Sequence, residues 1–283
     1  MKLTTYNIQY GFGADGLYSL PRIADAIRDR DLIAVQEVDR HWSRTGHDDQ
    51  PARLAALLPD HHMVYGPAFD MALPGERIRR RQFGPLILSR WPILWSRLWP
   101  LPKRRMIDPI NTQTAALEAV IAHPSGPIKL VNLHLAHVGV EERLDQIAYL
   151  KAMLAHPAAE GGPWSGTDDE PDRNWTEGEA EPPNPTRAIW AGDFNMEPGS
   201  AEYRALLGQT PYHPGARYAD GLIDPAAGLG LHTHVKRIAG ETRHRQLDHI
   251  FLSPDLAPLV TRVWAQNDCP ASDHHPLHLD LAL

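Results

Sequence analysis

The feature that most constrains the fold is an uninterrupted apolar run of strand length, Leu32-Ile33-Ala34-Val35. A strand with one face in water alternates apolar and polar residues, so a continuous run indicates a strand buried on both faces. The fold must therefore supply a layer on each side of that strand. A chain of 283 residues with 42% hydrophobic and 22% charged residues can bury such a core.

Strand-like and helix-like segments alternate along most of the chain. Strands are expected at 2–9, 31–38, 83–89, 114–122, 128–135, 187–191, 246–252, 260–265 and 277–283. Helices are expected at 19–28, 50–58 and 140–154, with a short one from about Ser200. The region between that short helix and residue 246 is expected to be rich in loops. No repeat or boundary divides the sequence, so we predict one domain, residues 1–283.

An acidic, Pro/Gly-rich insertion at 156–186 interrupts this pattern. It holds eight acidic residues and one basic residue, which accounts for the whole formal charge of −7. The insertion has no apolar periodicity, so it is predicted to be a loop or a lid. The rest of the chain is balanced, 27 basic against 27 acidic residues. Proteins that follow duplex DNA usually carry a basic excess, so this balance disfavours bulk nucleic acid as the substrate.

Cysteine content and the N-terminus bear on the compartment. The single cysteine, Cys269, excludes an intramolecular disulfide and disfavours a cysteine-built zinc site. The N-terminus shows no signal-peptide pattern, and no apolar stretch approaches 18 residues. These features predict a cytoplasmic protein without a membrane span. They leave the oligomeric state open.

Polar residues recur where the buried strands end. Asn7, Glu37, His134, Asp193 and Asn195 each lie at or just beyond the end of an apolar strand. Asp248, Asp273 and His274 lie just before the apolar part of a later one. Each residue alone has an ordinary structural explanation, such as a turn, a cap or a solvated carboxylate. Together, carboxylates, amides and imidazoles at one edge suit a hard divalent cation and a phosphate.

Seven motifs in order carry a resemblance to a known family. They are Thr5-Tyr6-Asn7, Gln36-Glu37-Val38, Gly84-Pro85-Leu86-Ile87-Leu88-Ser89-Arg90-Trp91-Pro92, Asn132-Leu133-His134-Leu135, Gly192-Asp193-Phe194-Asn195, Leu247-Asp248-His249-Ile250-Phe251 and Ser272-Asp273-His274-His275-Pro276. The chain resembles the endonuclease/exonuclease/phosphatase superfamily, the deoxyribonuclease-I-like metallohydrolases. The resemblance implies an α/β four-layer sandwich, with two packed mixed β-sheets flanked by helices. It also implies metal-dependent cleavage of phosphoesters, usually with Mg²⁺ and possibly Mn²⁺.

The resemblance also implies roles for the matching residues. Glu37 is expected to bind the metal, with Asn7 beside it and Asp273 nearby. Asp193 is expected to orient or deprotonate the attacking water, and Asn195 and His134 to bind phosphate oxygens. Asp248 and His274 resemble an Asp–His pair in which the carboxylate fixes the imidazole tautomer. The sequence leaves open whether Asp193 or His274 is the base.

Two further features lie just after His134: a pair of polar residues on the helix that follows it, and one residue of the segment that leads to this helix. Arg143 and Gln146 match a family pattern and are expected to bridge that helix to the sheet. Close relatives often read Asn-x-His-x-Asp-His at the preceding strand end, whereas this chain has Ala136 in place of the Asp. The missing carboxylate weakens any transfer of substrate from those relatives but leaves the core site intact.

The substrate has to be inferred from residues outside the core motifs. Basic clusters at 77–81, 103–105 and 243–245 are either solvated loop charge or an anion-binding rim, in which Arg81 and Arg105 would grip a phosphate ester. Trp164 and Trp175, in the insertion, could close over a small ligand. A separate series is Trp91, Trp95 and Trp99, which lies in a strand-like stretch and favours sheet packing over base stacking.

Three functions remain open at this point. The leading one is a divalent-metal-dependent phosphodiesterase or phosphatase acting on a small or lipid-derived phosphate ester by in-line attack of water. The second is a DNA or RNA endo- or exonuclease, disfavoured by the charge balance. The third is a non-catalytic scaffold of the same fold, which the intact set of polar residues makes the weakest of the three.

Overall fold

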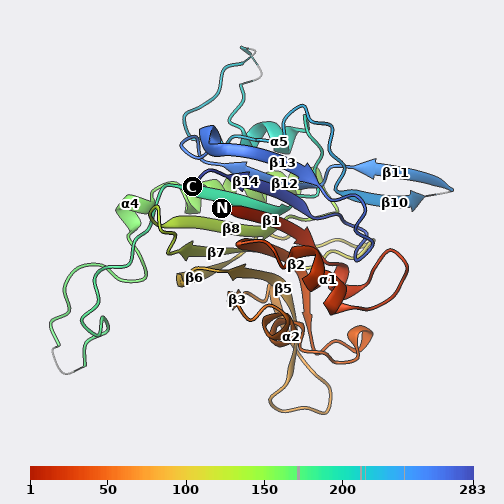
Figure 1. Cartoon of the computed structure of the whole chain (residues 1–283), viewed down its shortest axis with the longest axis horizontal. Coiled ribbons are helices and arrows are strands. Elements are labelled where there is room, and N and C mark those ends of the chain that lie inside the picture. The colour runs from red at the N-terminus through yellow and green to blue at the C-terminus, as the bar shows by residue number, and fades with distance from the viewer. Residues whose placement is uncertain (171–172, 211, 214, 239) are drawn as a thin grey trace.

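Two β-sheets packed face to face form the centre of the molecule in this computed structural model (Figure 1). The structure describes residues 1–170, 173–210, 212–213, 215–238 and 240–283. Within those residues the first sheet has the order β13-β14-β1-β2-β5-β3, with β4 also paired to β5, and the second has the order β12-β9-β8-β7-β6. A separate hairpin is made of β10 and β11.

The strand bounds are as follows. The first sheet contains β1 (Lys2–Asn7), β2 (Leu32–Arg40), β3 (His62–Tyr65), β4 (Phe69–Ala72), β5 (Arg80–Ser89), β13 (Val260–Ala265) and β14 (Leu277–Leu281). The second contains β6 (Ile93–Pro100), β7 (Ala115–Ile121), β8 (Ile128–His134), β9 (Ala188–Asp193) and β12 (Asp248–Leu252). The hairpin pairs β10 (His234–Ile238) with β11 (Glu241–Arg245). Two pairs are parallel, β1 with β2 and β8 with β9, and the other pairs are antiparallel.

Helices cover the outer face of each sheet. On the first sheet lie α1 (Leu20–Ile27) and α2 (Gln50–Leu57), and on the second lie α3 (Val140–Met153) and α5 (Ala201–Leu206). Short elements complete the set: α4 (Pro157–Glu160) and the 3₁₀ turns at Gln9–Gly11, Ser43–Thr45 and Ala257–Leu259. The order helix, sheet, sheet, helix is the four-layer α/β sandwich that the sequence resemblance implied.

The apolar run in β2 is buried on both faces, as its pattern predicted. Leu32 and Ala34 join the core between the two sheets, where they pack with residues such as Leu130 and Ile189. Ile33 and Val35 join the core between the first sheet and α1 and α2. Alternate side chains of one strand therefore hold three of the four layers together.

A buried polar clamp fixes the two sheets against each other. The pairing of β2 with β5 is interrupted between Val35 and Val38 by a bulge at Gln36 and Glu37. The Nδ2 atom of Asn132, on β8 of the other sheet, donates to the main-chain oxygens of Val35 and Leu86, both at 2.9 Å. The Oδ1 atom of Asn132 accepts from Nε2 of Gln36 at 2.7 Å. A residue of the opposite sheet therefore satisfies the hydrogen-bonding groups around the bulge. This contact fixes the position of Glu37, in the bulge, relative to His134 on β8.

Most expected elements are present within a few residues of their predicted bounds, and Trp95 and Trp99 lie in β6, with Trp91 two residues before it. The expectation of loops before residue 246 was wrong in part, because residues 234–245 form the β10–β11 hairpin. Its second strand, Glu241–Arg245, is polar and largely exposed, so it lacks the apolar alternation that signals a strand. The short strands β3 and β4 were also missed for want of a clear pattern.

The acidic insertion lies at the end of the sandwich remote from the polar strand ends. The chain enters it from the C-terminus of α3 and leaves it at Ala188, the first residue of β9, whereas Asp193 is the last. A strand of six residues separates those two ends by about 17 Å. The insertion is anchored there by Arg97, which pairs with Glu160, and by Trp95, whose Nε1 donates to the oxygen of Pro183. Figure 1 shows it projecting at the left; residues 171–172 within it lie outside the described residues.

Among the helices that the structure describes, none combines the length and the apolar character needed to cross a membrane.

Candidate active site

Parallel pairing brings the polar strand ends to one edge of the sandwich. In the first sheet Asn7 of β1 is paired with Gln36 of β2, next to Glu37. In the second sheet His134 of β8 is paired with Asp193 of β9. Asp248 begins β12 and lies opposite Asp193 in the antiparallel ladder. Asp273 and His274 precede β14, whose first residue, Leu277, pairs with Thr5 of β1.

The main chain is strained at this edge. Gln9, Tyr10, Glu37 and Asn195 have left-handed φ angles of 43°, 43°, 61° and 48°. Such conformations cost free energy in residues other than glycine and tend to be retained where they position functional groups. Gly192 has a different reason to be glycine, since a Cβ atom there would lie 1.9 Å from the main-chain oxygen of Leu133. The close approach of β8 and β9 sets His134 beside Asp193.

Asp193 is the centre of the site. Its side chain is buried, and its Oδ2 atom accepts a hydrogen bond from Nδ2 of Asn7 at 3.0 Å. The same oxygen lies 3.6 Å from Nε2 of His134 and 3.8 Å from Nε2 of His274. Burial raises the pKa of Asp193, but the two imidazoles and the donors outweigh it and lower the pKa below its ordinary value. The carboxylate is therefore ionised.

Asp248 and His274 form a buried pair. Oδ2 of Asp248 lies 2.7 Å from Nδ1 of His274. Burial opposes the charged imidazolium, but the carboxylates of Asp248 and Asp193 outweigh it and raise the pKa of His274 to about 10. The pair is thus charged in the free protein, with a proton on the Nε2 atom that faces Asp193. This is the Asp–His arrangement that the sequence resemblance implied.

The cluster has ligands suited to a hard divalent cation. Glu37, His134 and Asp193 each offer an atom within 4.8 Å of the others. Asn7 donates from Nδ2 to Oε1 of Glu37 at 2.9 Å as well as to Asp193, which holds the two carboxylates together. Carboxylate oxygens set close together in a partly buried cleft fit a cation such as Mg²⁺. The Oδ1 atom of Asn7 accepts from the main-chain N–H of Gln9 at 3.0 Å and keeps a second lone pair, so the role of Asn7 as a metal ligand stays a prediction.

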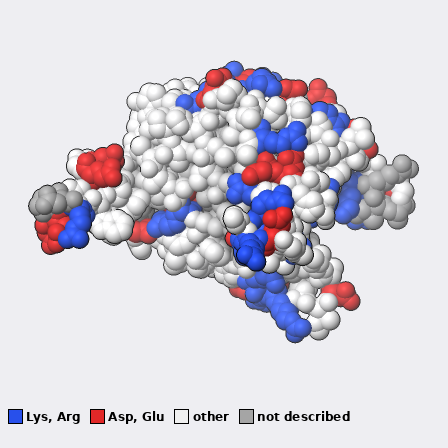
Figure 2. Space-filling view, turned by 90° about the horizontal axis from the view of Figure 1, so that it is seen from below, with Lys and Arg blue, Asp and Glu red and all other residues white. Residues whose placement is uncertain are grey.

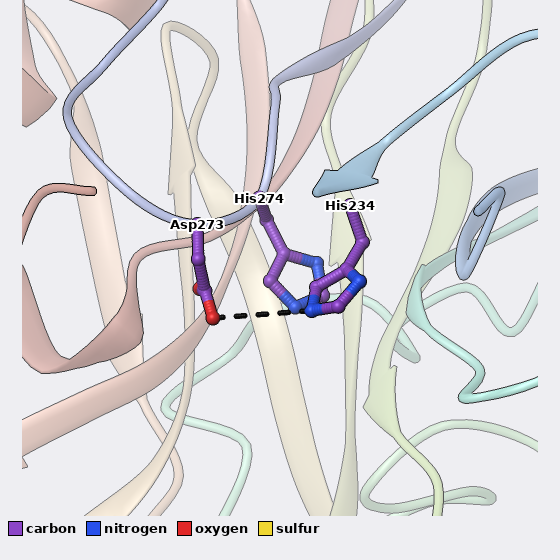
Figure 3. Close-up of side chains that lie close together, drawn as sticks. All are labelled: His234, Asp273 and His274. Atoms are coloured by element: carbon purple, nitrogen blue, oxygen red, sulfur yellow. Dashed lines mark ion pairs between the residues drawn. The ribbon is translucent and has the colours of Figure 1, made fainter. Parts of the chain in front are cut away.

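Asp273 and an unexpected histidine form the neighbouring part of the site. Nε2 of His234 lies 3.9 Å from Oδ2 of Asp273, and the rings of His234 and His274 lie 4.7 Å apart between centroids (Figure 3). Gln9 also donates to Asp273, at 3.1 Å. Sequence reasoning missed His234 because it lies in the segment expected to be a loop. The adjacent Thr233 gives the reason for its position, since its Oγ1 atom accepts from the main-chain N–H of Leu247 and of Asp248.

Asn195 is held at the rim of the same site. Its main-chain N–H donates to Oδ1 of Asp193 at 2.9 Å, and its Nδ2 atom donates to the oxygen of Leu135 at 3.0 Å. An amide nitrogen carries two hydrogens, so one remains for an anionic ligand. The geometry is compatible with the phosphate-binding role that the resemblance implied.

Arg143 and Gln146 of α3 hold the segment after His134, as expected. Arg143 donates to the oxygen of Ala136 at 2.9 Å and pairs with Glu202 of α5 at 2.8 Å. Gln146 accepts from the N–H of Ala136 at 2.9 Å. These bonds join helix to sheet, and no carboxylate stands at position 136 to add to the cluster.

The four residues predicted to touch substrate fall into two groups. Arg81 lies in β5 next to Gln82, which pairs with Arg40, three residues beyond Glu37. Arg105 is exposed in the segment between β6 and β7, which enters β7 beside the end of β8. Both stand at the same end of the sandwich as the site, and their contact with substrate stays a prediction. Trp164 and Trp175 lie in the insertion at the other end, and Trp175 is 90% exposed. The structure does not bring these tryptophans to the site, so the prediction that they enclose substrate finds no geometric support.

Comparisons with known proteins agree with this fold. Residues 4–274 match the profile of the Endonuclease/Exonuclease/phosphatase family. A protein of that family from Beutenbergia cavernae aligns over 100% of this chain and 71% of its own, with 22% identity and a TM-score of 0.65. The mannosyl-6-phosphatase Bt3783 of Bacteroides thetaiotaomicron aligns over 100% of both chains, with 17% identity and a TM-score of 0.66. ANGEL2, a 2′,3′-cyclic phosphatase, aligns over 98% of this chain and 93% of its own, with 16% identity and a TM-score of 0.59. No curated protein matches the chain.

Proposed function

Because the chain belongs to the endonuclease/exonuclease/phosphatase family, whose members hydrolyse phosphate esters, we propose that it hydrolyses a small or lipid-derived phosphate ester by in-line attack of water. The observation that carries the proposal is the convergence of Glu37, His134 and Asp193 with the Asp248–His274 pair at one edge of the sandwich. Enzymes of this family depend on divalent metal, and Mg²⁺ is the cation we propose, with Mn²⁺ as a substitute.

The metal would be held by Glu37 with help from the neighbouring Asp193 and Asp273, and it would neutralise charge on the phosphate oxygens. The residues of the chain supply the rest. His134, Asn195 and the charged His274 would donate hydrogen bonds to non-bridging oxygens, where charge develops in the transition state. Asp193 Oδ2 would hold the attacking water and receive its proton. Asp248 would keep the Nδ1 proton of His274 in place, so that Nε2 faces the phosphate.

The position of the insertion changes the case against nucleic acid. The acidic insertion was predicted to be a loop or a lid, and as a lid its charge would repel a polyanion, yet it projects from the end of the sandwich away from Asp193. Figure 2 shows acidic side chains with a basic one on that projection at the left, and Lys and Arg interspersed with Asp and Glu over the rest of this face. The small ester remains the better proposal because the rest of the chain has no basic excess.

A substrate screen tests the proposal directly. Purified protein with Mg²⁺ or Mn²⁺ is offered phosphomonoesters, phosphodiesters including bis-(p-nitrophenyl) phosphate, and supercoiled plasmid. We expect turnover of one small ester class and little nicking of the plasmid under the same conditions. Efficient nicking with poor turnover of every small ester would establish the nuclease instead. A complete lack of turnover with all substrates and both metals would favour a non-catalytic scaffold.

A further inference from the structure

A cavity of about 600 Å³ opens directly beside the candidate active site. Asp273, which faces His234 and His274 in Figure 3, is part of its wall. The other wall residues come from three separate segments: the loop after β1 (including Gln9, Tyr10 and Phe12), Arg44 in the loop after β2, and Val235 and Lys236 of β10. A ligand whose phosphate lies at Asp193 would therefore extend into this cavity past Asp273.

Two cationic side chains, those of Arg44 and Lys236, face the cavity, and Arg44 already binds a carboxylate. Arg44 makes two hydrogen bonds to the buried Asp39, from Nε at 2.8 Å and from Nη2 at 2.7 Å. Its guanidinium lies over the rings of Tyr10 and Trp42, its Nη1 atom makes no hydrogen bond to another described residue, and its side chain is 41% exposed. Lys236 is exposed and makes no ion pair within the described ranges. A cation without a partner at the wall of a cavity is a ready site for an anionic group.

Two aromatic rings, those of Tyr10 and Phe12, line the same cavity as these cations and Asp273. The guanidinium carbon of Arg44 lies 4.0 Å from the centre of the Tyr10 ring, which fixes the position of that ring. The rings of Tyr10 and Phe12 lie 6.0 Å apart. Tyr10 and Gln9 owe their places to the strained backbone after β1, where both residues have φ angles of 43°. The wall of the cavity thus combines two aromatic rings, arranged edge to face, with the positive charges of Arg44 and Lys236.

We propose that the organic half of the substrate binds in this cavity and carries a second anionic group, which Lys236 and Arg44 recognise. The substrate would then be a small phosphate ester of an alcohol that bears a further carboxylate or phosphate. This inference rests on the proposed function, because it assigns the cavity to the substrate of the same site. The family and the core residues do not determine which class of phosphate ester is the substrate, and this inference names that class.

Two matched pairs of esters test the proposal. Phenyl phosphate is compared with 4-carboxyphenyl phosphate, and methyl phenyl phosphate with methyl 4-carboxyphenyl phosphate, so that monoester and diester chemistry are both covered. One charge-assisted contact corresponds to about a tenfold preference, so wild-type kcat/KM should favour the carboxylated ester by about that factor. In Lys236→Gln the preference should fall to about twofold, with the rate on the uncharged ester retained. Lys236→Arg should restore it.

Lys2→Gln is the matched control, since Lys2 is also an exposed lysine but begins β1 at the end away from Asn7. It should keep the wild-type preference. A wild-type protein that does not distinguish the two esters, or a preference that survives in Lys236→Gln, would overturn the proposal. So would a loss in Lys236→Gln that falls on plasmid nicking rather than on the carboxylated ester, because the cations would then serve a nucleic acid.

A binding measurement separates this proposal from the proposed function. Calorimetric titration of 4-carboxyphenyl phosphate and phenyl phosphate into the Asp193→Asn protein with Mg²⁺ needs no turnover. Tighter binding of the carboxylated ester, lost when Lys236→Gln is added, supports the cavity even if no ester is hydrolysed by the wild type. Hydrolysis of the esters together with equal binding of both would leave the proposed function standing and reject the cavity as the site of a second anion.

Discussion

Asp248 holds His274 from the side opposite Asp193. Oδ2 of Asp248 lies 2.7 Å from Nδ1 of His274, while Nε2 of the same ring lies 3.8 Å from Oδ2 of Asp193. The imidazole therefore lies between two buried carboxylates: Nδ1 is within hydrogen-bond distance of Asp248, and Nε2 lies near Asp193 without a hydrogen bond to it. The work of Asp248 is to orient and charge His274, and the work of His274 is to face the phosphate.

We expect His274→Ala to lower kcat by about 10²-fold or more, the usual scale for a lost charge-stabilising or acid–base group. Asp248→Asn should be less severe, because it removes orientation rather than the group itself. The double variant Asp248→Asn/His274→Ala should be no slower than His274→Ala alone, since residues that act as one unit are not additive. Steady-state kinetics on the best substrate of the screen measures the cycle.

The control for that cycle is His62→Ala, an exposed histidine of β3 outside the site, which should keep wild-type kinetics. Losses that multiply in the double variant would show that Asp248 and His274 act independently.

We expect turnover to depend on a divalent metal that Glu37 binds. Treatment with EDTA should abolish turnover, and Mg²⁺ or Mn²⁺ should restore it. Glu37→Gln should require a higher Mg²⁺ concentration for half-maximal rate, by about tenfold or more, because it replaces a charged oxygen ligand with a neutral one. Titration of the apoprotein with Mn²⁺ by calorimetry gives a readout independent of turnover, and it should show weaker binding by the variant.

Glu76→Gln is the matched control, since this exposed carboxylate pairs with Arg79 outside the site. It should leave the Mg²⁺ requirement as in the wild type. Full activity of metal-free protein would reject a metal-dependent mechanism altogether.

The sequence predicts the fold and the core site well for a physical reason. Strand ends such as Asn7, Glu37 and Asp193 follow directly from buried strands, and parallel neighbours must bring such ends to one edge. The apolar run in β2 likewise requires a layer on each face, which the structure supplies. At these positions the local sequence pattern agrees with the fold as a whole, so the pattern alone was sufficient to predict them.

The parts that sequence could not predict depend on long-range placement. Trp164 and Trp175 were expected near the site because the insertion lies between two elements that lead to it. However, β8 and β9 are parallel, so α3 has to carry the chain back to the far end before β9 begins. His234 was missed because long-range bonds place it beside His274. Thr233 accepts from the main-chain N–H of Leu247 and Asp248, and the main-chain N–H of His275 donates to the oxygen of Thr233.

The clamp between the sheets should be essential for stability. Asn132→Leu would remove the Asn132 donor from the buried oxygens of Val35 and Leu86. Gln36 would lose one acceptor but would keep its bonds to Thr5 Oγ1 and to the oxygen of Ala34. Unpaired buried polar groups cost 1–3 kcal/mol each, so we expect a loss of about 3 kcal/mol in the free energy of unfolding. Urea unfolding followed by circular dichroism measures it.

Asn267→Leu is the comparison, because Asn267 is exposed and makes a single bond to the oxygen of His232. Its cost should stay below about 1 kcal/mol. An equal, small cost in both variants would mean that water or a local shift replaces the clamp.

Replacement of residues 163–181 with a short Gly/Ser linker should leave catalysis unchanged. The insertion joins β9 at Ala188, at the end away from Asp193, and its anchors at Glu160 and Pro183 lie outside the replaced stretch. We expect kcat and KM for the small substrate to stay within about twofold of the wild type, because the full length of β9 separates the insertion from the site. A rise in KM, or a gain in plasmid cleavage, would show that the insertion reaches the cleft after all.

A buried histidine far from the site should make the protein sensitive to acid. His278 in β14 is 2% exposed, and burial together with the nearby Arg30 lowers its pKa to about 3. The ring packs against Trp264 at 4.9 Å between centroids, and Nε2 lies 3.2 Å from Oε1 of Gln266. The charged groups around it are Arg30, Asp29 and Arg262.

The direction of the pH dependence follows from the protonation of His278 in the unfolded and in the folded protein. The unfolded chain protonates His278 near its ordinary pKa, about 6.5, while the folded protein keeps it neutral. Stability from this group is therefore complete above about pH 6.5 and is lost as pH falls toward 3, by up to about 1.4 kcal/mol per pH unit. His278→Phe keeps the aromatic contact and removes the titration, so its free energy of unfolding should fall less steeply between pH 7 and 5. Urea unfolding in EDTA at pH 7, 6 and 5 measures both slopes, and parallel slopes would show that His278 stays uncharged in the unfolded chain or becomes charged in the folded one.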